Sequence, residues 1–192
     1  MKITNIAFAT ALILTATNMF AQDTAEDTHT ISLGVPEVAL LDLESETGTA
    51  ISLNGTAPTE AGEKVIFDAT NNDIWINYSS IIGSSSEPTR TIEVQITDGE
   101  IPAGLELTVL ATKDAGHGDG TMGKVSKTAI LLSTTSAQKI IDGVGSSYTG
   151  NGANKGHNLT YSLSQKTTNG SYADLDFNKS QTISITYTLS DN

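Results

Sequence analysis

The stretch Gln181–Ser190, QTISITYTLS, alternates between polar and apolar side chains at every position from Thr182 onward. One face carries three aliphatic residues and one tyrosine, and the other face carries only serine and threonine. The apolar residues are Ile183, Ile185, Tyr187 and Leu189. A period of two residues is typical of a β-strand with one buried face and one solvated face. The stretch therefore predicts a strand that packs its apolar face against a core.

The same alternation recurs in other parts of the chain. Its clearest further examples are Ile74–Tyr78, Thr89–Thr97, Leu105–Ala111 and Leu159–Leu163. Shorter apolar runs occur at Ile31–Val35, Val38–Leu43, Ile51–Leu53, Lys64–Ala69, Ala129–Leu132 and Lys139–Ile141. Turn-forming residues separate these runs, and no segment after Ala21 keeps a helical period over three turns. The pattern predicts an all-β fold of about nine strands, an immunoglobulin-like β-sandwich with Greek-key links. A jelly roll is the alternative.

Two details of this prediction concern polar residues within the strands. We expect Asn71–Asp73 to close the preceding run as a turn, because Asn and Asp favour turns. In Thr89–Thr97 we place Ile92, Val94 and Ile96 on the inner face, and Arg90 on the outer face with its polar neighbours.

The first 21 residues have the composition of a targeting segment. Lys2 is basic, Ile6–Ala16 is an apolar run too short to span a bilayer, and Ala21 precedes an abruptly polar segment. These features predict a signal peptide at residues 1–21, with no membrane span after its cleavage. The alternative is an uncleaved N-terminal anchor. We expect a secreted protein, located in a bacterial periplasm, at the cell surface or outside the cell.

The remainder is predicted to contain a short arm and one domain. Residues 22–30 are acidic and polar without periodicity, which predicts a flexible arm. Residues 31–192 are predicted to form a single β-sandwich domain. The chain has no cysteine. The domain must therefore be stable through packing alone, and its length is sufficient for a core.

The chain is strongly acidic, with a formal net charge of −12 at pH 7. A negative field of this size repels phosphate backbones and anionic membrane surfaces. Nucleic acid is therefore an unsuitable partner. The general effect of such a charge is to keep a protein soluble.

Gly118–Gly123, GDGTMG, matches the spacing G-x-G-x-x-G and is followed by Lys124. In nucleotide-binding proteins this motif leads into a helix whose N-terminus faces phosphate. Here a connector and a strand are predicted instead, and Val125 stands where a P-loop has the Ser or Thr that binds magnesium. We therefore interpret the segment as a glycine-rich loop at a sheet edge.

Two acids in the same region, Asp114 and Asp119, offer hard oxygen ligands of the type that calcium prefers. Their spacing matches no EF-hand. Calcium is therefore the only cofactor that the sequence leaves open, and solvated acids in turns are the alternative.

No catalytic motif is found in the sequence. The three histidines, His29, His117 and His157, lack the spacing of zinc ligands, and the chain has no G-x-S-x-G elbow. We therefore predict that the protein is not an enzyme.

Gly143–His157, GVGSSYTGNGANKGH, is the segment in which we expect a binding site. It is longer than a hairpin requires, and long loops on rigid sandwiches often carry function. Tyr148 offers an aromatic face, while Asn151, Asn154 and His157 offer hydrogen bonds. This combination is suited to sugars or to protein edges. The alternative is a flexible connection between sheets.

The final third of the chain resembles small bacterial surface domains. The glycine-rich segment, the strand Leu159–Leu163 and the strand Ile183–Leu189 are similar to the end of fimbrial-subunit-like, spore-coat-protein-U-like and WxL-like β-sandwiches. The resemblance covers the chain from about Leu105 onward. The cysteine pair common in fimbrial subunits is absent, and Asn77 stands where a WxL motif at Trp75 would have Leu.

The fimbrial resemblance implies a mode of assembly. Such subunits lack one strand, which the N-terminal arm of a neighbour supplies. Here the arm would be Gln22–Val35, with Ile31, Leu33 and Val35 as its apolar contacts. The alternative is that Ile31–Val35 forms the first strand of its own domain.

Two functional hypotheses follow. The first is a secreted, non-enzymatic structural or adhesive subunit of a bacterial cell envelope, which binds protein subunits and can form a homo-oligomer. The second is a carbohydrate-binding module that binds surface glycans through residues 143–157.

Overall fold

The computed structural model describes residues 25–83, 85–86, 88–167 and 172–192. The predicted signal peptide, residues 1–21, lies outside the described residues. Contacts within the chain divide it into two units, Met1–Gly34 and Val35–Asn192. In the first unit, the described residues 25–34 contain no helix or strand and are exposed.

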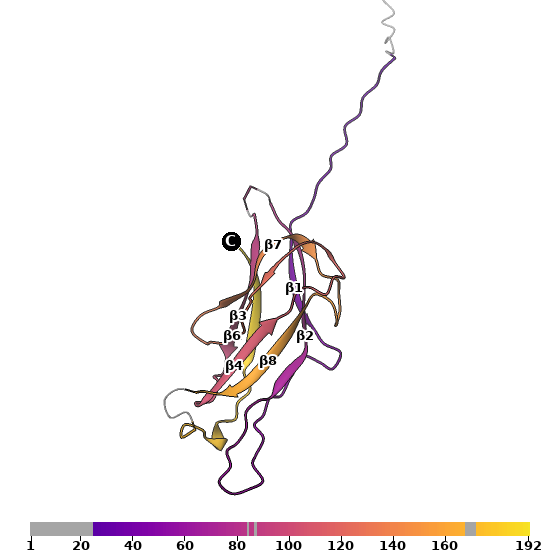
Figure 1. The fold of residues 1–192 in the computed structure, drawn as a ribbon. Coiled ribbons are helices and arrows are strands. Elements are labelled where there is room, and N and C mark those ends of the chain that lie inside the picture. Colours follow the sequence, from indigo (N-terminus) through magenta and orange to yellow (C-terminus); the bar gives the residue numbers. More distant parts are fainter. Residues whose placement is uncertain (1–24, 84, 87, 168–171) are drawn as a thin grey trace, which may run out of the picture. The chain divides into compact units, whose positions relative to one another are not determined.

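The second unit is built from β-strands (Figure 1). Its described residues contain nine strands and one short 3-10 helix. The strands are β1 (Val38–Glu44), β2 (Thr70–Ile81), β3 (Arg90–Asp98), β4 (Leu105–Ala111), β5 (Asp119–Val125), β6 (Ile130–Leu131), β7 (Gln138–Tyr148), β8 (His157–Gln165) and β9 (Ser184–Asp191), and the helix is η1 (Phe177–Lys179). The predicted all-β sandwich is confirmed. The immunoglobulin-like Greek key stays a prediction.

All strand pairs are antiparallel, and hydrogen bonds connect the strands in the order β6-β4-β8-β2-β7-β3-β9. β1 adds to β2, and β5 adds to β7. β2 and β7 pair through only Ser79 with Tyr148 and Ser80 with Ser147. This short pairing joins two groups of strands, β1-β2-β8-β4-β6 and β5-β7-β3-β9. β4 and β8 lie side by side within the first group (Figure 1).

Buried side chains from both groups form one hydrophobic core. In most strands alternate residues supply it, as their period of two residues predicts, whereas in β7 the adjacent Ile140 and Ile141 are both buried. Its members with 2% exposure or less are Ile74, Ile76, Ile92, Val94, Ile96, Val109, Ile140, Ile141, Val144 and Leu159. The predicted strands in the regions of β2, β3, β4, β8 and β9 are therefore confirmed. β9 pairs with β3, which has β7 on its other side.

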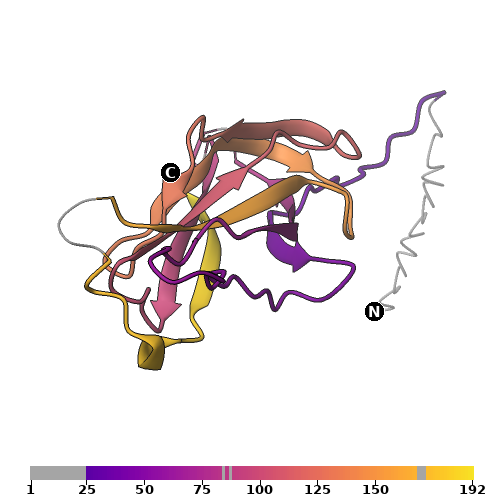
Figure 2. The same ribbon diagram turned by 60° about the horizontal axis from the view of Figure 1, so that its bottom comes forward.

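Several short apolar runs do not form strands. The structure has no strand at Ile31–Val35, so the expectation of a first strand there was wrong. Ile51 and Leu53 lie in a loop and pack against the core from outside the sheet. In the run Lys64–Ala69 only Ile66 pairs, through an isolated bridge to Thr56. The loop that holds these runs lies at the lower end of Figure 1, as does η1, and both come forward in Figure 2.

The predicted turn at Asn71–Asp73 was also wrong, because these residues belong to β2. The pairing of β2 with β8 changes register between Asn71 and Ile74. At this irregularity, the Asn71 side chain accepts a hydrogen bond from the backbone N–H of Asp73 at 3.1 Å. The turn-type bond that asparagine favours thus occurs within a strand, where it accompanies a bulge.

Arg90 is buried rather than outward-facing, which corrects the sequence-based prediction. Its side chain is 1% exposed. It forms ion pairs with Glu37 at 2.7 Å and Asp191 at 2.6 Å, and it donates hydrogen bonds to the carbonyls of Val38 and Ile81. Arg90 lies an even number of residues before Ile92, so the alternation of β3 places it on the inner face. Its partners make that burial tolerable.

Candidate functional site

The predicted binding loop is shorter than expected. β7 continues to Tyr148 and β8 begins at His157, so the connection comprises residues 149–156 rather than 143–157. The glycine-rich first part is a strand because it pairs on two sides. Val144, for example, pairs with Arg90 of β3 and with Met122 of β5.

Tyr148 and Asn151 line a groove, together with residues of β1 and β2 that the sequence did not point to. We call it the Tyr148 groove; its volume is about 500 Å³. The groove residues of β1 and β2 that are relevant to ligand binding are Leu40, Asp42, Asn77 and Ser79. A sequence signal for two of them exists: Leu40 and Asp42 share one face of the run Val38–Leu43, which is the solvent face.

A row of side chains crosses four strands at this groove, and its members on β1, β2 and β7 line the groove. Leu40 of β1 pairs with Ser79 of β2, Ser79 pairs with Tyr148 of β7, and Tyr148 pairs with Asp119 of β5. Directly opposed residues of antiparallel strands point to the same face, with Cβ atoms about 5 Å apart. The face is the outer one, since Leu40 is 66% exposed and Tyr148 is 53% exposed. A second row, Asp42 with Asn77, lies beside the first.

Hydrogen bonds hold the 149–156 connection in place. The N–H of Thr149 donates to the carbonyl of Tyr78 at 3.1 Å, and the N–H of Tyr78 donates to the Thr149 hydroxyl at 3.0 Å. The Asn77 side-chain amide donates to the carbonyl of Gly152 at 2.9 Å. Asn154 has a left-handed backbone, with φ of 63°, and its side chain donates to Glu46 at 2.6 Å. Asn154 thus fixes the connection and does not line the groove.

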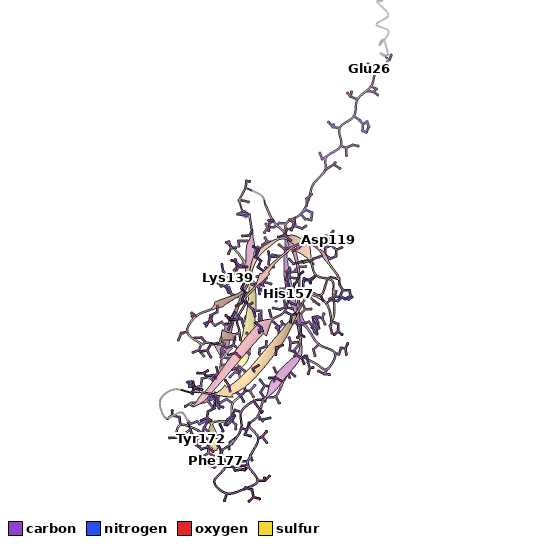
Figure 3. All side chains as sticks on the ribbon, in the orientation of Figure 1. Glu26, Asp119, Lys139, His157, Tyr172 and Phe177 are labelled. Atoms are coloured by element: carbon purple, nitrogen blue, oxygen red, sulfur yellow. The ribbon has the colours of Figure 1, made fainter. Side chains whose placement is uncertain are left out.

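His157 lies inside the domain and is 1% exposed (Figure 3). Its Nδ1 is 2.9 Å from the carbonyl oxygen of Thr112, and its Nε2 is 3.0 Å from the hydroxyl of Tyr78. The Tyr78 hydroxyl also donates to the carbonyl of Met122. The His157 and Tyr78 rings are nearly parallel, with centroids 5.6 Å apart. His157 therefore supports the groove from beneath, through Tyr78, rather than facing a ligand.

Burial sets the protonation of this pair. Desolvation lowers the pKa of His157, while the Thr112 carbonyl and the Asp114 charge act in the opposite direction. Desolvation raises the pKa of Tyr78, and Asp114 adds to that effect. Both effects favour a neutral His157 and a protonated Tyr78 at neutral pH.

The two candidate calcium ligands are held by their own turns. One Asp114 carboxylate oxygen, Oδ2, accepts from the N–H of Gly116 at 2.7 Å, and Asp119 accepts from the N–H of Gly120 at 2.7 Å. The other Asp114 oxygen is buried and has no hydrogen-bond partner among the described residues. Among all the residues that the structure describes, no three His, Asp or Glu side chains lie close enough together to hold a metal ion.

The glycine motif Gly118–Gly123 is not a loop, because most of it forms β5. β5 pairs with β7 and does not lead into a helix. A Cβ at Gly118 would overlap the carbonyl oxygen of Tyr148. Glycine is therefore required there because β5 lies so close to β7, and the motif has no arrangement for phosphate binding.

A second groove opens onto the core beside β9. We call it the β9 groove; its volume is about 530 Å³. Loop residues, strands β4 and β8, and the start of β9 line it with mostly apolar side chains. These include Ile51, Leu53, Leu107, Leu163, Ile183 and Ile185. The sandwich is thus incompletely closed along β9.

Comparison of the chain with family models, curated proteins and solved structures gives no match. Among the residues that the structure describes, no helix is long and apolar enough to cross a membrane. The features of the molecule that bear on function are therefore the two grooves and the exposed N-terminal residues.

Proposed function

We propose that this protein is a secreted, non-enzymatic structural subunit of a bacterial cell envelope that associates with copies of itself through its N-terminal residues. One observation carries the proposal: Ile31, Leu33 and Val35 are 72%, 93% and 81% exposed and belong to no strand. Three apolar side chains at every second position form the pattern of a strand with one buried face. Leaving them in water is unfavourable, so a partner that buries them stabilises the protein.

The β9 groove has the properties of the complementary surface. Its lining is mainly apolar, and β9 pairs on one side only, with β3, among the described strands. A strand added along the free side of β9 would gain backbone hydrogen bonds, and every second side chain would enter the groove. Three residues at alternate positions span about 13 Å in an extended strand. We therefore assign Ile31–Val35 of one copy to the β9 groove of the next.

The charge of the chain sets a condition on this association. Copies with a formal net charge of −12 repel one another at low ionic strength. Added salt screens exposed charges, with a Debye length of about 10 Å at 0.1 M. Association through apolar side chains should therefore strengthen as salt is raised, whereas association through ion pairs would weaken.

The experiment is sedimentation velocity of the purified secreted protein over a range of concentrations and salt. We expect oligomers that grow with concentration. Leu33→Asp should abolish them, while the matched variant Ser32→Asp adds the same charge at the neighbouring polar position and should retain them. Neither residue belongs to the sandwich unit. A monomer at all concentrations, or equal effects of the two variants, would overturn the proposal.

A further inference from the structure

We propose that the Tyr148 groove is a binding site for a neutral sugar chain, with the Tyr148 ring as the surface on which a pyranose stacks. The inference does not depend on self-association, because the groove shares no residue with Ile31–Val35 or with the β9 groove. The sequence predicted a carbohydrate site in a loop, whereas this groove lies mainly on a sheet face.

Apolar and polar groups alternate along one row of the groove. Tyr148 and Leu40 are exposed on either side of Ser79, so the row offers an aromatic ring, a small hydroxyl and an aliphatic side chain in sequence. The C–H face of a pyranose is apolar, and its hydroxyls lie around the rim. Such a ligand can cover Tyr148 and Leu40 while its hydroxyls reach the polar side chains beside them.

The charges at the groove are negative. The groove is lined by Asp42, and the row continues past Tyr148 to Asp119, while no Lys, Arg or His is among the described residues that line it. Asp119 is labelled in Figure 3 near the upper end of the sandwich, whereas Tyr172 and Phe177 are labelled near its lower end. Carboxylates accept hydrogen bonds and repel anions. The carboxylates therefore favour a ligand rich in hydroxyl donors over phosphorylated, sulfated and acidic sugars.

The site is already ordered without a ligand. Asn151 extends from a connection that Thr149, Asn77 and Asn154 hold by the hydrogen bonds described above. Asn151 itself is exposed, so its amide is accessible both as donor and as acceptor. Binding therefore requires little ordering of the loop, which removes one of the main costs of association. The groove is shallow and open, which fits one or two units of a chain rather than an enclosed monosaccharide.

The test is a glycan array that includes neutral and acidic oligosaccharides, followed by titration calorimetry with the neutral oligosaccharide that gives the strongest signal. We expect neutral glycans to bind and acidic ones not to bind. Tyr148→Ala should raise the Kd at least tenfold, and Tyr148→Phe should retain binding because the ring remains. Tyr172→Ala is the matched control, since Tyr172 is 47% exposed and far from the groove.

Three results would overturn the proposal. One is no signal for any neutral glycan on the array. Another is equal binding by the Tyr148→Ala and Tyr172→Ala variants. The third is a preference for a lysine-rich peptide whose binding falls with salt and with Asp42→Asn, which would make the groove a site for a cationic protein segment. Tyr148 and Asp42 are exposed, so circular dichroism should show all variants folded.

Discussion

The hydroxyl oxygens of Tyr161 on β8 and Tyr187 on β9 lie 2.7 Å apart inside the sandwich. In the sheet order, β2, β7 and β3 separate these two strands, so the bond crosses the core from one group of strands to the other. Burial raises the pKa of Tyr161 to about 12 and raises that of Tyr187 further above its ordinary value. Both hydroxyls therefore stay protonated at neutral pH, and each serves as the other's partner.

This pair predicts a specific result in a double-mutant cycle. Tyr187→Phe leaves the buried Tyr161 hydroxyl without its partner and should lower the free energy of unfolding by about 1–3 kcal/mol. Tyr161→Phe should act similarly. The double variant should lose clearly less than the sum of the two, because it leaves neither hydroxyl unpaired. Urea unfolding measures all four proteins, and additive losses would contradict a direct bond.

Arg90 predicts a contrast between ion pairs made by a buried cation and an ion pair between two exposed side chains. Arg90→Leu removes the ion pairs with Glu37 and Asp191, whose carboxylates remain hydrated because they are about half exposed, and it leaves the carbonyls of Val38 and Ile81 without these donors, so we expect a loss of about 1–3 kcal/mol. Lys139→Ala removes the pair with Asp142, whose partners are both about half exposed. That loss should be much smaller. Thermal unfolding compares the two variants, and similar losses would show that Arg90 contributes no more than a surface charge.

We predict that a side chain at position 118 would disturb the packing of β5 against β7. Gly118→Ala places a Cβ against the carbonyl of Tyr148 and should push β5 away from β7. Gly116→Ala is the matched control, since Gly116 also lies before β5 but has open space, with only the strain of its positive φ. Hydrogen exchange should show loss of protection in Asp119–Val125 for Gly118→Ala alone. Equal protection in both variants would mean that β5 tolerates a side chain there.

His157 predicts a loss of stability in mild acid. Its pKa in the folded protein is lowered, chiefly by burial, from the ordinary value of about 6.5 that the unfolded chain has. As pH falls below about 6.5, the unfolded chain takes up a proton that the folded protein does not. This contribution is therefore complete above pH 6.5 and is lost progressively as the pH falls toward the lowered pKa.

Two measurements test that prediction. An NMR titration of the imidazole should give an apparent pKa below 6.5 for His157. The fall in Tm between pH 7.5 and pH 5.5 should be smaller in His157→Gln than in the unaltered chain, since glutamine does not titrate. A His157 that titrates at or above 6.5 would show that Asp114 and the Thr112 carbonyl outweigh burial.

Sequence alternation predicted the strands whose two faces have different environments. It succeeded for Ile183–Leu189 because threonine and serine on the outer face mark the period. It failed for Gly118–Gly123 and Gly143–Tyr148, because a glycine-rich strand has few side chains to display a period. These segments are strands because their backbones approach one another closely, as at Gly118.

Long-range partners explain the remaining differences. The ion-pair partners of Arg90 lie 53 and 101 residues away in the chain, so the sequence near Arg90 did not indicate that its charge would be neutralised. Tyr148 and Asn151 were recognised as candidates from their own segment. Leu40 and Asp42 join them only through the register between β1 and β2, which local sequence does not specify.

The position of Arg90 also has a mechanical consequence. Its guanidinium contacts Glu37, directly before β1, and Asp191, the last residue of β9. A pulling force applied between the two ends of the sandwich would therefore load this side chain, together with the hydrogen bonds that join Asn192 to Thr89 and Thr91, before it loaded the inner backbone pairs of β1 or β9. Once these contacts released, β1 and β9 would peel from β2 and β3 one residue pair at a time, so Arg90 acts as a clasp between the first and last strands of the sandwich.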